Sequence, residues 1–501
     1  MTATIDAYSR LERHFHDIIV LGDAVRVLHW DQATIMPPGG AAARSEQLAR
    51  LEVLRHEKLI APEIPALLEE AEQTKSELGD WQRANLREMR RMYRQDASLQ
   101  ADLVAAHSRA YSLCEIAWRT ARREDDFGAI VKPLGELLGL TRQIAGTRAD
   151  ALGCTPYDAL LAEYEPDGKS AIIDPLFDDL AAFLPDFLDD VLSRQDSNGR
   201  PRRPSGPFPR ERQRSLCNRL AETVGLDFES ARLDESAHPF SSGVPEDSRI
   251  TVRYNEEDFG EAVMAVLHEA GHAMYERGRP ADWRYQPVGR ARGMVLHESQ
   301  SLLVEMQACR TPEFYTWLGP ALREAFDGDG DAWDSDNLHR LATRVERGLI
   351  RVDADEVTYP AHVILRYRLE KAMLAGDLPL ADLPQAWNKG MQELIGITPP
   401  DDRQGCLQDI HWYAGAWGYF PTYTLGALAA AQLFDAAVKA DPDILAGLGK
   451  GDFTPLMRWL RRNVHGHGSS LATDDLIAEA SGQPLTADSF KAHLHRRYLD
   501  A

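Results

Sequence analysis

Two histidines separated by three residues stand in a run of helix-forming residues, His268 and His272. On an α-helix, positions i and i+4 lie one above the other, about 6 Å apart along the axis. Both imidazoles could therefore reach one metal ion, at about 2.0–2.1 Å if the ion is zinc. Glu269 would lie beside the ion without binding it, placed to take a proton from a metal-bound water. A five-residue match is also common by chance, so an ordinary structural histidine pair remains an equal alternative on this motif alone.

A third candidate ligand follows after a loop rich in proline and glycine, in the motif His297-Glu298-Ser299-Gln300. A catalytic zinc ion uses three protein ligands and keeps one position open. Two histidines and a glutamate from a neighbouring helix satisfy that number. Glu298 is the expected third ligand, and Glu305, further along the same apolar run, is a weaker competitor. The two motifs together favour a zinc-dependent hydrolase.

The composition is that of an ordinary soluble globular protein. The chain has 501 residues, of which 44% are apolar and 27% charged, and this length suffices for two lobes on either side of a cleft. The net charge of −22 argues against nucleic-acid or anionic-membrane partners. A stripe of arginines between Trp81 and Arg94 is typical of a solvated helix face with acidic partners nearby.

The cysteines and the N-terminus indicate the compartment. Five scattered cysteines without a C-x-x-C motif are typical of reduced, buried thiols in a cytoplasmic protein. The residues after Met1 lack the basic and apolar regions of a secretion signal, and no stretch of 18 apolar residues occurs. We therefore expect a cytoplasmic, soluble protein.

Helical spacing of apolar residues predicts a mostly α-helical fold, with helices over 8–30, 101–122, 131–151 and 174–192. Residues 193–209, which contain Asn198-Gly199 and several prolines, predict an exposed loop within a single domain. This loop would separate an N-terminal helical lobe, about 1–195, from a catalytic and C-terminal helical part, about 210–501. Ile250–Tyr254 is the best strand candidate. It predicts a small antiparallel sheet near the metal helix, where extended peptide could pair with it.

Four further clusters carry residue types that a peptidase requires, but each alone has an ordinary structural explanation. Arg249 and Arg351 could be members of ion pairs, for example with Asp247 or Asp355. His411-Trp412 could be a core pair, and Tyr423 a packed aromatic residue.

Six motifs then follow one another in a fixed order: His238-Pro239-Phe240; Asp247-x-Arg249-x-Thr251; His268-Glu269-x-x-His272; His297-Glu298-Ser299-Gln300; Ile350-Arg351-x-x-Ala354-Asp355; and Gly405-x-x-Gln408-Asp409-x-His411-Trp412. In this order the chain resembles the thermostable carboxypeptidase Taq family of zinc metallocarboxypeptidases, over essentially its whole length. One departure is a longer and more basic connection at Gly199–Pro207, outside every motif.

The resemblance implies a helical fold shared with neurolysin and the angiotensin-converting enzymes, in which a long groove divides two helical lobes. It also implies homodimers, and a zinc ion held by His268, His272 and Glu298, with Glu269 as the general base. Cobalt or manganese would be accepted by the same ligands. The implied reaction is release of single amino acids from the C-terminus of peptides, with broad specificity and proline disfavoured.

For the remaining roles the resemblance offers candidates. By analogy with helical zinc peptidases, His411 and Tyr423 stabilise the oxyanion, and Tyr419 is a rival to Tyr423. A substrate carboxylate suits an arginine fork; Arg351 is the first choice and Arg249 the second, although Arg249 could equally brace the sheet edge. Two alternatives stay open: a zinc oligopeptidase that cuts internal bonds, and a catalytically inactive helical scaffold that binds peptides.

Overall fold

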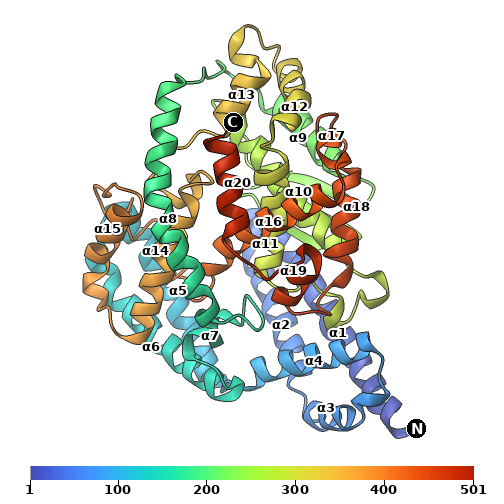
Figure 1. Ribbon diagram of the computed structural model, residues 1–501. Coiled ribbons are helices and arrows are strands. Elements are labelled where there is room, and N and C mark those ends of the chain that lie inside the picture. The colour runs from blue at the N-terminus through green and yellow to red at the C-terminus, as the bar shows by residue number, and fades with distance from the viewer. Residues whose placement is uncertain (1, 501) are drawn as a thin grey trace.

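The computed structural model describes residues 2–500 and is predominantly helical (Figure 1). The first part of the chain forms α1 (Thr2–Ala33), α2 (Ala41–Leu59), α3 (Ile64–Gln73), α4 (Asp80–Ala97), α5 (Ala101–Glu124), α6 (Phe127–Leu152), α7 (Pro156–Leu161), α8 (Ser170–Ser197) and α9 (Arg210–Val224). After a small sheet come α10 (Phe259–Gly278), α11 (Met294–Leu302), α12 (Pro312–Ala325), α13 (Ser335–Ala342), α14 (Tyr359–Ala375), α15 (Leu383–Leu394), α16 (Pro421–Ala440), α17 (Asp443–Leu448), α18 (Thr454–Asn463), α19 (Thr473–Ser481) and α20 (Asp488–Tyr498).

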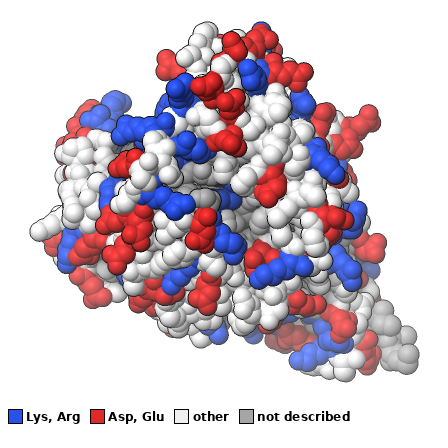
Figure 2. Space-filling view, turned by 45° about the horizontal axis from the view of Figure 1, so that its top comes forward, with Lys and Arg blue, Asp and Glu red and all other residues white. Residues whose placement is uncertain are grey.

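The helices gather into two masses that combine early and late parts of the chain. In Figure 1, α5, α6, α14 and α15 form the left part, and α14 and α15 pack against α8. To the right of these helices, near the middle of the view, α11 packs against both α10 and α16. The space-filling view is hollowed near its middle, between the two masses, with charged side chains of both signs around the hollow (Figure 2). The mostly helical fold expected from the sequence is confirmed.

The sheet is mixed, not wholly antiparallel as expected. Its strands are β1 (Ala231–Glu235), β2 (Ser241–Val244) and β3 (Asp247–Val252), in the order β1-β3-β2. A tight connection makes β2 antiparallel to its sequence neighbour β3, whereas β1 pairs with β3 in parallel. The chain reverses twice between β1 and β3, which gives these two strands the same direction. The sheet packs against α10, next to the candidate metal motif as expected.

The connection predicted at 193–209 begins later than expected, because α8 continues through Ser197. Tertiary contacts hold its last turn: the side-chain amide of Gln195 donates to the carbonyl of Val345, and the backbone N–H of Val345 donates back, each at 2.9 Å. Such a partner lies far away in the sequence, so helical spacing could not reveal it.

The five cysteines are free, and four of them are buried as expected. Cys154 is the exception and is exposed at the surface. Among the helices in residues 2–500, none is long and apolar enough to cross a membrane.

A buried carboxyl group fastens the segment after α15 to α14. Glu370 is fully buried and accepts hydrogen bonds from the hydroxyl of Tyr157, the indole N–H of Trp412 at 3.1 Å and the backbone of Gly418. Burial raises the pKa of Glu370 to about 7 despite these bonds. The segment it fastens carries His411 and leads into α16, so Glu370 contributes to the placement of the candidate site.

We expect the Glu370→Gln variant to lose part of the pH dependence of stability. The unfolded protein releases the Glu370 proton near pH 4.5, whereas the folded protein keeps it up to about pH 7. Stability from this group is therefore present at low pH and declines by about 1.4 kcal/mol per pH unit between these values. Thermal unfolding at pH 5 and pH 7 measures the effect. The exposed Glu393→Gln change is the control, and an identical pH slope in both variants would contradict the assignment.

Candidate active site

The metal motif lies on α10, and one glycine sets its distance from α11. Asp258 caps α10, since its carboxylate accepts the backbone N–H of Gly260 at 2.8 Å. A Cβ atom at Gly271 would lie 2.6 Å from the carbonyl oxygen of Gln300 and 2.7 Å from the Cα of Ser301. Real Cβ atoms do not approach backbone that closely, so Gly271 allows α11 to lie directly on α10.

A second glycine brings α16 against the same point. A Cβ atom at Gly426 would lie 2.8 Å from the Cβ of Glu298. The segment that carries Glu298 therefore lies close to both α10 and α16, and its carboxylate faces the histidines of α10.

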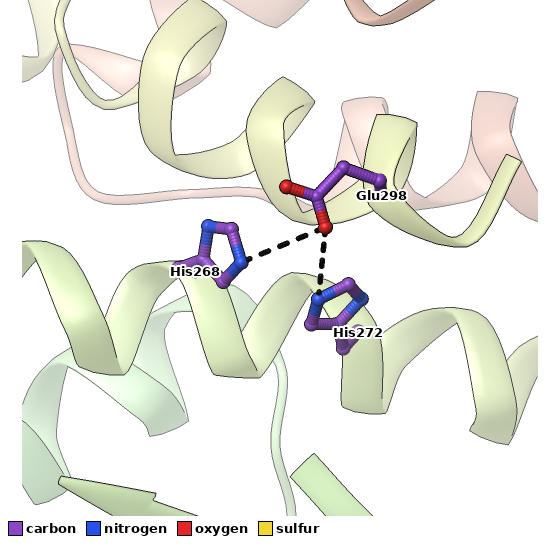
Figure 3. A group of neighbouring side chains, drawn as sticks. All are labelled: His268, His272 and Glu298. Atoms are coloured by element: carbon purple, nitrogen blue, oxygen red, sulfur yellow. Dashed lines mark ion pairs between the residues drawn. The ribbon is translucent and has the colours of Figure 1, made fainter. Parts of the chain in front are cut away.

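Three side chains converge at this contact (Figure 3). Oε2 of Glu298 lies 4.0 Å from Nε2 of His268 and 3.6 Å from Nε2 of His272. One ligand atom from each residue falls within 4.8 Å of the others, and in residues 2–500 this is the one such group of His, Cys, Asp or Glu. Two imidazole nitrogens and one carboxylate oxygen are a donor set that suits a catalytic zinc ion, and cobalt or manganese also accepts such a set.

The opposite nitrogen of His268 is held by Glu305. Nδ1 of His268 lies 3.0 Å from Oε2 of Glu305, whose other oxygen accepts from Arg310 at 2.8 Å. An ionised carboxylate only accepts, so in the neutral imidazole Nδ1 carries the proton and the Nε2 lone pair faces Glu298. Glu305, the weaker competitor for third ligand in the sequence, is therefore a carboxylate that orients His268.

His272 is oriented by a longer relay. Nε2 of His297 lies 3.2 Å from the carboxylate of Glu276, and Nδ1 of His297 lies 2.7 Å from Nδ1 of His272. When His297 donates to Glu276, its Nδ1 accepts, so His272 donates through Nδ1 and keeps its Nε2 lone pair. Sequence reasoning missed both roles, although Glu276 lies one helical turn beyond His272 and His297 stands next to Glu298.

The protonation equilibria reflect a buried excess of negative charge. Burial alone would lower the pKa of His268, but the hydrogen bond that it donates to Glu305 and the charges of Glu298 and Glu269 raise it to about 10. The pKa of His272 is well below its usual value, because it is buried beside His297 and His268. A divalent cation would supply the positive charge that this cluster of carboxylates attracts.

Glu269 is placed for proton transfer. Its side chain is buried, and its Oε2 is a buried atom without a hydrogen-bond partner in the described chain. Burial and the neighbouring carboxylates raise the pKa of Glu269 to about 7, with His268 opposing them. A general base works best when its pKa lies near the working pH.

The helix that carries Glu298 continues as a π-helix, η5 (Leu303–Ala308), whose end is hydrogen-bonded by a side chain of α20. The backbone bond from Cys309 to Val304, at 2.9 Å, spans five residues. Arg497 donates to the last carbonyls of this helix, Met306 at 2.6 Å and Gln307 at 3.2 Å. A cation at a helix C-terminus satisfies carbonyls and complements the helix dipole. Arg497 thus caps the segment that presents Glu305 to His268.

A second buried cluster surrounds Arg351, at the start of the short helix η7 (Arg351–Asp353). Oδ1 of Asp409 accepts from Nε and Nη2 of Arg351 at 3.0 and 2.7 Å. The buried Arg366 donates to Oδ2 of Asp409 at 2.5 Å. These two arginines hold the pKa of Asp409 well below its usual range, against the effect of burial. Nη1 of Arg351 forms no hydrogen bond to Asp409. Burial raises the pKa of Glu298, and the charge of Arg351 is among those that oppose this rise.

The aromatic candidates lie beside Arg351. Nε2 of His411 lies 3.2 Å from the hydroxyl of Tyr423, and the guanidinium of Arg351 lies 5.0 Å from the Tyr423 ring centre. Tyr419 packs edge-on against Tyr423, with ring centres 5.0 Å apart. Tyr359, which sequence reasoning missed, packs against Tyr423 and hydrogen-bonds with Arg351. No sequence motif distinguished Tyr359 from an ordinary core aromatic.

Arg249 lies elsewhere, on β3. It donates to both carboxylate oxygens of Asp247, at 3.0 and 2.7 Å, and stacks over the ring of Trp30 at 4.2 Å. These are the contacts of a residue that braces the sheet edge, the second of the two roles open to Arg249. Within residues 2–500, Arg249 forms no hydrogen bond or ion pair with His268, His272 or Glu298.

The fold and this site define a metal-dependent peptide hydrolase, and comparison with known proteins gives the family. Residues 10–498 match the family described as carboxypeptidase Taq (M32) metallopeptidase, and the chain belongs to this family. It is 35% identical to thermostable carboxypeptidase 1 of Thermus thermophilus, covering 98% of both chains, and 31% identical to carboxypeptidase 1 of Bacillus subtilis, covering 97% and 98%. The structure of Trypanosoma cruzi metallocarboxypeptidase 1 superposes with a TM-score of 0.97 and 38% identity, covering 99% of this chain and all of that one. The resemblance seen in the motifs is confirmed.

We expect Arg497→Ala to weaken binding of the divalent metal. The change removes the cap from η5 and leaves Glu356, which accepts from Arg497 at 2.8 Å, with less compensating charge. Outer contacts of metal ligands typically contribute about 10–100-fold in metal affinity, and we expect a loss of about tenfold here. The exposed neighbour Arg496 provides the control, Arg496→Ala. Competition with a chromogenic chelator measures the affinity; a lower Tm with unchanged affinity would restrict Arg497 to general stability.

Proposed function

We propose that the protein is a zinc-dependent carboxypeptidase that releases single C-terminal amino acids from peptides, with broad specificity and proline disfavoured. The observation that carries the proposal is the position of Arg351. It is a buried cation, fixed by Asp409 through Nε and Nη2, whose charge acts on Glu298 and whose Nη1 forms no hydrogen bond to Asp409. A cation at that place suits a free C-terminal carboxylate lying next to the scissile bond.

In this proposal His268, His272 and Glu298 hold the zinc ion. Zinc, when bound, supplies Lewis-acid polarisation of the scissile carbonyl and of the attacking water. Glu269 takes the proton from that water and later delivers it to the leaving amine. Its buried carboxylate, with one oxygen free of hydrogen bonds, supports this role.

Donors for the developing oxyanion come from the loop after Asp409 and from α16. His411 and Tyr423 share one hydrogen bond of 3.2 Å, and either side chain can exchange it for a bond to an oxyanion. Burial lowers the pKa of His411 to about 4, so the imidazole is neutral at neutral pH and keeps one N–H. Tyr423 is favoured over Tyr419 because Tyr423 hydrogen-bonds with His411 and contacts Arg351, whereas Tyr419 meets His411 only through a ring contact and also packs against Tyr164.

We also expect the protein to form a homodimer and to be located in the cytoplasm.

The first experiment is mass spectrometry of a mixed peptide pool, with the wild-type protein, with added chelator and with Glu269→Gln. We expect a ladder of single C-terminal losses from the wild type, with peptides that present a C-terminal proline shortened slowly. The ladder should vanish with chelator, return with zinc, and fall by about 10²–10⁴-fold in Glu269→Gln, which keeps its metal. Internal fragments would indicate an oligopeptidase, and no cleavage by the metal-loaded protein would indicate a binding scaffold.

The second experiment compares Arg351→Ala with Arg249→Ala. Loss of a charged, buried carboxylate contact should lower kcat/KM by about 10²–10³-fold for peptides with a free C-terminus. Residual activity on C-terminally amidated peptides should change little. Arg249→Ala should lower the Tm and leave kcat/KM within a few fold. The reverse result would transfer the carboxylate-binding role from Arg351 to Arg249.

A further inference from the structure

The residues that line one basic cavity are distant in sequence from those of the metal site. The cavity is basic although the protein carries a net charge of −22. It has a volume of about 860 Å³ and lies between α4 and α7, at the foot of the molecule in Figure 1. Its walls come from the end of α3 and the following turn, from α4, and from the segment between the end of α6 and the start of α8. Seven cationic residues line it: Lys75, Arg83, Arg87, Arg90, Arg91, Arg94 and Lys169.

The acidic residues that line the cavity are already engaged. Glu72 accepts two hydrogen bonds from Arg90, at 2.8 and 2.6 Å. Glu88 is bound by Arg91 and by Arg292, each at 2.8 Å. The other two acids are also used, since Asp167 pairs with Arg292 and Asp158 accepts the backbone N–H of Ser170 at 2.7 Å.

Three cations remain without a partner. Within residues 2–500, the side chains of Lys75, Arg94 and Lys169 form no hydrogen bond or ion pair with another residue. They come from three separate segments and line one concave surface. Part of the arginine stripe pairs with acids, as the sequence predicted, but the surface it helps to line keeps an excess of positive charge.

Two walls of the cavity are joined by a buried ion-pair network behind them. The side chain of Arg292 is fully buried and joins Glu88 of α4 to Asp167 of the turn before α8. Arg87 of α4 donates to the carbonyls of Ser469 and Ser470, at 3.0 and 3.1 Å. A preformed site binds with a smaller ordering cost than a flexible one.

We propose that this cavity binds a multiply charged phosphate compound, either a nucleotide or an inorganic oligophosphate. Its volume falls within the range of about 300–1,000 Å³ that is usual for small-molecule sites. Arginine offers a planar fork and lysine a mobile point charge, and both bind phosphate oxygens. Several phosphate charges spread over one molecule would satisfy cations that come from different walls.

The test is calorimetric titration of the full chain with sodium tripolyphosphate, with ATP and with a hexaglutamate peptide, at constant ionic strength. The variant carries Lys75→Gln, Arg94→Gln and Lys169→Gln. The control carries Lys132→Gln, Arg200→Gln and Lys450→Gln, which remove the same charge from exposed positions outside the cavity. Any effect of phosphates on the metal centre is common to the three proteins.

We expect the wild type and the control to bind a phosphate ligand equally, and the cavity variant to bind it at least tenfold more weakly. Binding of tripolyphosphate alone would identify an inorganic oligophosphate site, and tighter binding of ATP a nucleotide site. Absence of binding, equal weakening in both variants, or tighter binding of hexaglutamate than of either phosphate would overturn the proposal. A thermal unfolding scan confirms that each variant is folded, and peptide hydrolysis by the cavity variant should match the wild type.

Discussion

The site depends on how closely three helices approach one another. Gly271 on α10 and Gly426 on α16 each lack the side chain that would separate their helix from α11. With both contacts made, the carboxylate of Glu298 reaches Nε2 of both histidines. Packing density in a protein interior is high enough that one added methyl group at either glycine must move backbone. The ligand geometry is therefore a property of helix packing and not only of the ligands.

Burial then determines which proton each group holds. Two imidazoles and several carboxylates lie in a low-dielectric interior, where an unpaired charge is strongly unfavourable. Glu305 fixes the tautomer of His268, and the relay from Glu276 through His297 fixes that of His272. When the rings are neutral, the Nε2 lone pairs of both histidines face Glu298. In the Asp409 cluster the excess charge is positive, and one buried carboxylate compensates and positions two arginines.

Much of the architecture was predictable from local patterns. The helical spacing of apolar residues predicted the long helices. The i, i+4 histidines together with the ordered motifs indicated the family. Contacts between distant residues were not predictable. Spacing presents Glu305 as a rival ligand, and only the three-dimensional structure places it on the far side of His268. Strand β1 was missed because Arg232 and Asp234 give it a charged, partly exposed pattern that resembles a loop. The parallel pairing of β1 depends on the path through β2, which no single strand pattern encodes.

The cap that Arg497 places on η5 comes from the last helix of the chain. Synthesis proceeds from the N-terminus, so the ribosome releases α20 only after every metal ligand has been made. During translation the histidines and Glu298 exist in a chain whose π-helix still has uncapped carbonyls. Full support of the candidate metal centre is thereby tied to synthesis of α20, and a nascent chain that still lacks α20 has the candidate ligands in place before the helix end beneath Glu305 is capped.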